Sequence, residues 1–113
     1  MTATGVSDVE RGVQDYLSHL GVERGLADNT LRSYRRDLRR YLRFLLSRGL
    51  TEPVSIGEQD VTAFLGDLRT GDEDHVPLGT ASAARAVVAV RGLHRFWVRE
   101  QLVTTDVTAA VKP

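Results

Sequence analysis

The chain has 113 residues, of which 42% are hydrophobic, and its 15 basic residues balance 15 acidic ones. This length and composition predict one globular domain over residues 1–113 and leave no room for a second. No apolar stretch approaches the roughly 20 residues of a membrane-spanning helix, and no signal pattern is present. We therefore expect a soluble, cytoplasmic protein. The absence of cysteine excludes disulfides, thiol nucleophiles and thiolate metal sites.

The charge is unevenly distributed along the chain, although it sums to zero. Residues 29–48 carry seven arginines and one acid, a net charge of +6. Residues 80–99 carry four arginines and no acid, whereas residues 50–78 carry seven acids and one arginine. Two basic segments separated by an acidic one favour an anion-binding face.

The first helix is predicted to begin after Ser7, because Glu10 follows at the spacing of a capping box. Apolar residues then recur at helical spacing from Val9 to Leu20. We expect Gly21 to end this helix.

A turn over residues 22–27 is expected to lead into the second helix, with Asp28 or Asn29 as its cap. Apolar residues keep helical spacing from Leu31 to Leu45, and Gly49 is the expected C-terminal stop. On a helical wheel these apolar positions cover a sector of about 100°. The nearly opposite sector carries Arg32, Arg35, Arg36, Arg39 and Arg43.

The third helix is predicted from about Glu58 to Arg69, with its acids, including Asp60 and Asp67, exposed. The acidic, glycine-containing segment 70–79 is predicted to form an exposed loop.

The fourth helix is predicted from Thr80 or Ser82 to about Glu100. Its buried sector comprises Ala86, Ala89, Val90, Leu93, Phe96 and Trp97, and its other face carries Arg85, Arg91, Arg95 and Arg99 among small residues. A last short turn over residues 106–111 is expected to close the bundle. The sequence therefore predicts an all-α fold, a compact four-helix bundle plus a short C-terminal helix.

Metal and catalytic motifs are weak in this sequence. His19, His75 and His94 lack the spacing of metal ligands, and Asp72–Asp74 lacks the central glycine of a calcium loop. No phosphate-binding or nucleophile motif occurs, and the three tyrosines lie in apolar stripes that favour core packing. We predict no metal, no cofactor and no catalysis by this chain alone.

The arginine faces of the second and fourth helices are the strongest candidate site. A single basic helix is commonly only solvated surface. Two basic helices with interleaved hydroxyl groups can instead straddle phosphates and present arginines to base edges. The candidate DNA-binding residues are Thr30, Arg32, Ser33, Arg35, Arg36, Arg39, Arg43, Ser82, Arg85, Arg91, Arg95 and Arg99.

Two stretches carry a resemblance to a known family. Residues 16–50, which contain NTLRSYRRDL from Asn29 to Leu38, resemble the opening of the N-terminal core-binding domain of tyrosine recombinases. RAVVAVRGLHRF, from Arg85 to Phe96, resembles a second family helix. The likeness is strongest to Xer-type members, although Ala27 and Val88 stand where that family often has serine.

The resemblance implies a SAM-like helical bundle that forms half of a clamp around double-stranded DNA, with its second and fourth helices facing the major groove. It implies that the catalytic residues belong to a separate C-terminal domain outside this chain. Implied partners are a second Xer-type recombinase in a tetrameric synaptic complex and a DNA translocase, in chromosome dimer resolution at cell division. A phage or transposon integrase is the alternative within this class, and a helical protein-interaction module is the alternative outside it.

Overall fold

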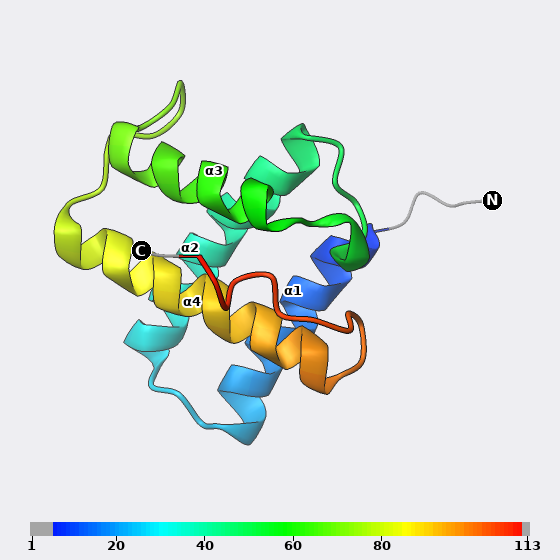
Figure 1. Ribbon diagram of the computed structural model, residues 1–113. Helices are drawn as coiled ribbons and strands as arrows, with labels where there is room; N and C mark the ends of the chain where they lie inside the picture. The colour runs from blue at the N-terminus through cyan, green and yellow to red at the C-terminus, as the bar shows by residue number, and fades with distance from the viewer. Residues whose placement is uncertain (1–5, 112–113) are drawn as a thin grey trace.

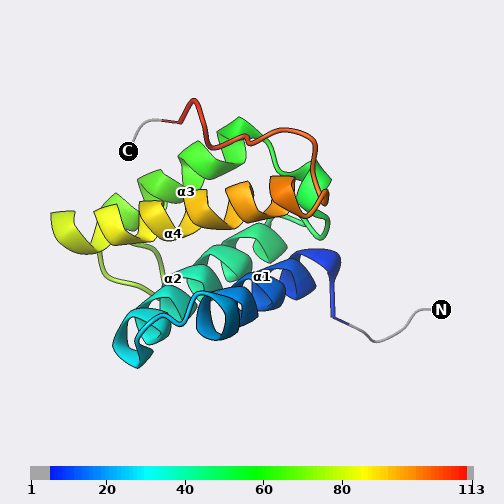
Figure 2. The same ribbon diagram turned by 90° about the horizontal axis from the view of Figure 1, so that it is seen from below.

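The computed structural model describes residues 6–111, and within that range it contains four α-helices and no strand. Figure 2 shows two layers, with α1 (Asp8–Ser18) and α2 (Asp28–Ser47) in one and α3 (Glu58–Thr70) and α4 (Thr80–Arg99) in the other. Among the described residues, none of the helices has the length and apolar character needed to cross a membrane. A π-helical turn η1 (His19–Glu23) follows α1, and a 3-10 turn η2 (Pro53–Ser55) precedes α3.

The first helix begins as predicted but does not end at the predicted residue. The Ser7 hydroxyl accepts a hydrogen bond from the Glu10 N–H at 3.1 Å, which satisfies one of the free donors of the first turn. Gly21 does not stop the helix, because it lies inside the π-helical turn that continues α1. The chain turns away at Gly25, whose φ of +61° is a conformation that glycine adopts without strain.

The predicted cap of α2 is wrong, whereas its predicted stop is confirmed. Ala27 occupies the N-cap position without a side-chain hydrogen bond, and Asp28 is already helical. The carboxylate of Asp28 therefore stabilises the first turn of α2 through its favourable interaction with the helix dipole. At the other end Gly49 has a φ of +76°, and the Leu50 N–H returns to the Leu45 carbonyl at 2.9 Å, as in a Schellman motif.

The third helix has the predicted position, but Asp60 is buried instead of exposed. Its side chain accepts hydrogen bonds from the Gly57 N–H at 2.8 Å and from Arg48 Nε at 3.1 Å. Only 6% of Asp60 is exposed. The carboxylate thereby caps α3 and ties its first turn to the C-terminal end of α2.

All six predicted core residues of α4 are buried, and Val87 and His94 are buried with them. Trp97 is fully buried in the centre of the core. It packs against Gly12 of α1, where a Cβ atom would come within 2.6 Å of the indole Nε1. The glycine therefore allows α1 to approach α4 closely.

The C-terminal segment forms the predicted turn, as a run of turns over residues 107–110, but not the short C-terminal helix expected with it. The Asp106 carboxylate accepts a hydrogen bond from the Thr108 N–H at 2.8 Å, a local bond that competes with helix formation. Thr108 and Val111 are buried. This segment, coloured red in Figure 1, runs back over α4 and covers part of the core.

Candidate nucleic-acid interface

Helix α4 crosses α2 (Figure 1). An ion pair between Arg85 and Asp37 joins the two helices. Arg85 donates from Nε to Asp37 Oδ2 at 2.8 Å and from Nη2 to Asp37 Oδ1 at 2.9 Å. Asp37 is only 6% exposed. The hydrogen bond to Asp37 raises the pKa of Arg85 above its ordinary value. This two-point contact fixes the relative position of the two basic helices.

A second polar contact joins the same helices within the core. Tyr41 Oη and His94 Nε2 are hydrogen-bonded at 2.7 Å, and both side chains are fully buried. Burial lowers the pKa of His94 to about 4, although Asp106 partly opposes this effect. Burial also raises the pKa of Tyr41. The pair is therefore uncharged at neutral pH.

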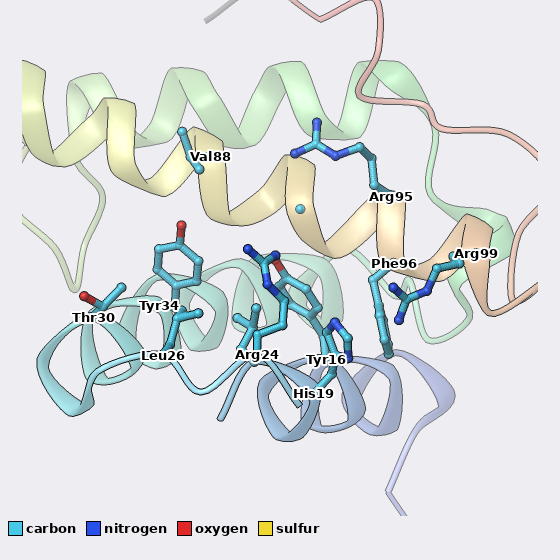
Figure 3. A pocket seen from close by; sticks show the side chains of 12 residues that line it. Tyr16, His19, Arg24, Leu26, Thr30, Tyr34, Val88, Arg95, Phe96 and Arg99 are labelled. Atoms are coloured by element: carbon cyan, nitrogen blue, oxygen red, sulfur yellow. The ribbon is translucent and has the colours of Figure 1, made fainter. Parts of the chain in front are cut away.

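One cleft lies between α4 and the region where α1 ends and α2 begins; we call it the Arg24 cleft. Its volume is about 530 Å³. Figure 3 shows Arg24 extending from the α1–α2 connection toward α4, which contributes Arg95 and Arg99. The remaining lining residues are Tyr16, His19, Leu20, Leu26, Thr30, Tyr34, Val88, Gly92 and Phe96.

A second cleft, the Arg36 cleft, lies between the middle of α2, the start of α4 and the loop before α4. Its volume is about 580 Å³. Arginines line it, but two carboxylates, those of Asp37 and Asp74, line it as well. The full lining is Arg36, Asp37, Arg39, Arg40, Arg43, Asp74, His75, Val76, Leu78, Ser82 and Arg85.

Comparison with known proteins identifies the family. The model of the phage integrase N-terminal SAM-like domain matches residues 13–101. The chain belongs to this family. The resemblance to tyrosine recombinases is thereby confirmed, and so is the all-α, SAM-like fold.

Several relatives of this SAM-like domain carry the name Tyrosine recombinase XerD. The protein of Mycobacterium tuberculosis (strain ATCC 25618 / H37Rv) is 55% identical over 103 residues, covering 89% of this chain and 33% of the relative. Those of Mycobacterium leprae (strain TN) and Corynebacterium glutamicum (strain ATCC 13032) are 53% and 44% identical, covering 89% and 87% of this chain and 33% and 32% of the relatives. The SAM-like domain thus spans about a third of the length of these curated relatives.

The two clefts of the SAM-like domain bring together eight of the twelve candidate residues. The Arg24 cleft takes Thr30, Arg95 and Arg99. The Arg36 cleft takes Arg36, Arg39, Arg43, Ser82 and Arg85. Of these, Arg85 has a carboxylate partner in Asp37, and Arg99 has one in Glu100 at 3.5 Å.

Four candidates lie outside both clefts. Arg32 and Arg35 are exposed on α2, Arg32 donating to Asn29 Oδ1 at 3.2 Å, and Ser33 is half-buried. Arg91 donates to the carbonyl oxygen of Val111 in the C-terminal segment. Residues 85 and 91 lie about 120° apart around a helix, so the two edges of the basic face of α4 meet different neighbours.

Periodicity could not identify two arginines that line the clefts. Arg24 follows the π-helical turn, outside any regular helical pattern, and its place in the cleft depends on tertiary structure. Arg40 lies on α2, but its side chain is only 11% exposed and its Nη2 lies 3.9 Å from Asp72 Oδ2. The sequence shows that Arg40 belongs to a basic segment, but it does not show that the acidic loop of residues 70–79 covers this side chain.

Proposed function

We propose that this SAM-like domain is the DNA-binding core-binding domain of a site-specific tyrosine recombinase and that α2 and α4 bind double-stranded DNA. The observation that carries this proposal is the pair of arginine-lined clefts to which both α2 and α4 contribute side chains. A duplex presents one negative charge for about every 1.7 Å of its axis. Guanidinium groups in two clefts lined by the same two helices can contact several phosphates along such a charged backbone.

The arginines divide into two roles in this proposal. Arg85 is a positioning residue, because its paired guanidinium holds α4 against α2. The exposed arginines of both helices bind DNA, most of them at phosphates and a minority at base edges in the major groove. Arg32 and Arg35, which lie on α2 beyond the clefts, extend the contact along the duplex.

The name of the relatives supports a proposal for the whole protein. We infer that it is XerD-like, cuts and rejoins DNA through catalytic residues outside this chain, and acts in the cytoplasm. Its proposed role is chromosome dimer resolution at cell division, in a tetramer with a second recombinase and with a DNA translocase. A phage integrase with the same domain is the nearest alternative.

The charge-reversing variant Arg36→Glu tests the DNA-binding proposal. Arg36 is exposed and lines the Arg36 cleft, so the loss of a phosphate contact should weaken binding about tenfold. Fluorescence anisotropy with a labelled duplex of about 30 base pairs measures the affinity. Arg69→Glu on α3 is the matched control, because Arg69 is exposed and lines neither cleft.

The proposal expects weaker binding for Arg36→Glu alone, with thermal unfolding unchanged in both variants. Equal affinities for the two variants, whether both normal or both reduced, would contradict a specific role for the α2 face. The protein-interaction alternative predicts a tight oligomer in sedimentation velocity without DNA. Some acids are already engaged within the chain, since Asp60 pairs with Arg48 and Asp72 lies near Arg40. This internal pairing supports DNA as the partner over self-association.

A further inference from the structure

The Arg24 cleft differs from the Arg36 cleft in having no carboxylate among its lining residues. Twelve residues line the Arg24 cleft; three are arginines and none is acidic. In the Arg36 cleft, Asp37 and Asp74 stand among the arginines and neutralise part of their charge. Both clefts therefore carry the same net charge of +3 from their arginines and aspartates, but only in the Arg24 cleft is there no lining carboxylate to repel a bound anion.

The backbone holds Arg24 at the edge of this cleft. Its N–H donates to the His19 carbonyl at 3.1 Å, which closes the π-helical turn. The Leu26 N–H then returns to the Leu20 carbonyl at 3.0 Å across Gly25. These bonds fix the direction of the connection, and Figure 3 shows the Arg24 side chain extending from it toward α4.

The floor and the opposite wall of the cleft are also well defined. Tyr16 lies beneath Gly92, where any Cβ atom would collide with the tyrosine hydroxyl. Burial is the largest cause that raises the pKa of Tyr16, so its hydroxyl stays protonated and able to donate near Arg24 and Arg95. On α4, the guanidinium of Arg99 lies 5.4 Å from the centre of the Phe96 ring, a cation–π contact, and its Nε lies 3.5 Å from Glu100 Oε2 at the rim, so both neighbours orient it.

We propose that the Arg24 cleft is a phosphate-binding site that receives one backbone phosphate of the bound duplex between Arg24 and the α4 arginines. This inference rests on the proposed function and adds a residue and a location to it. Guanidinium groups suit this role because their planar donors match phosphate oxygens. A volume of about 530 Å³ accommodates a phosphate together with its sugar and ordered water.

The test compares Arg24→Gln with the wild-type protein and with Arg69→Gln as the matched control. Arg24 is exposed, so the substitution should leave the fold intact. Affinity for a duplex of about 30 base pairs should fall about tenfold, and the slope of log K against log salt should become shallower by about 1. Arg24→Lys, which keeps the charge, should retain the wild-type slope.

Two duplexes of unrelated sequence complete the experiment. A phosphate contact carries no sequence information, so Arg24→Gln should weaken binding to both by the same factor. Wild-type affinity and slope in Arg24→Gln, or a loss on one duplex only, would overturn the phosphate site while leaving the proposed function standing. Failure of the wild-type protein itself to bind DNA would overturn the proposed function. The two failures are therefore distinguishable.

Discussion

Replacing Asp37 with alanine is expected to lower the free energy of unfolding by about 3 kcal/mol, because the change breaks a buried ion pair from one side. Asp37 is 6% exposed and holds two donors of Arg85. This loss of stability is at the lower end of the range for broken buried ion pairs. The reason is that the Arg85 side chain is 32% exposed, so its guanidinium can be hydrated once Asp37 is gone. Urea denaturation at pH 7 measures the effect.

A double-mutant cycle with Arg85→Ala separates the ion pair from the packing of each side chain. The double variant should lose clearly less stability than the sum of the losses in the two single variants, because each single change already removes the same contact. The control is Arg11→Ala, because the Arg11–Asp8 pair has a similar distance, 3.0 Å, but is well exposed. This control should be close to neutral. Additive effects of Asp37→Ala and Arg85→Ala would show that the pair does not hold the helices together.

Acidification is expected to destabilise the protein through His94. Burial lowers the pKa of His94 to about 4, below the ordinary value of about 6.5 that it regains on unfolding. Between these two values the unfolded chain binds a proton that the folded chain does not, so stability falls as the pH falls through this window. The loss from His94 should reach about 3 kcal/mol at pH 4 and level off below it.

The variant His94→Gln isolates this contribution, because glutamine can still hydrogen-bond Tyr41 but does not titrate. Urea denaturation at pH 7 and pH 4 should show a smaller loss for the variant than for the wild-type protein, by about 3 kcal/mol. An NMR titration of the His94 ring in the wild-type protein provides a second measurement. A ring that becomes protonated near pH 6.5 in the folded protein would contradict the burial of a neutral His94.

The sequence predicted the helices well where periodicity and end signals agree. Strong apolar spacing placed the buried faces of α2 and α4, while Ser7 placed the start of α1 and Gly49 the end of α2. The errors occurred where tertiary contacts outweigh local pattern. Asp60 is buried because it caps α3 and also meets Arg48, a residue of another element. The π-helical turn that carries the chain past Gly21 has no distinctive periodicity.

The candidate site was predictable as two basic helix faces but not as two clefts. A helical wheel shows that Arg85 and Arg91 share the exposed sector of α4. It cannot show that one edge of this sector meets Asp37 of α2 while the other meets the C-terminal segment. Arg24 was missed for a related reason, since its position depends on how the α1–α2 connection folds back toward α4.

The most direct test of DNA binding by α2 and α4 is the salt dependence of the wild-type protein's affinity for a duplex of about 30 base pairs. If four to six of the exposed arginines meet phosphates, log K should fall with log salt with a slope of about −4 to −5. Fluorescence anisotropy across a salt series measures this slope. A flat salt dependence, or no detectable binding at low salt, would contradict a DNA-binding role for the two arginine-lined clefts.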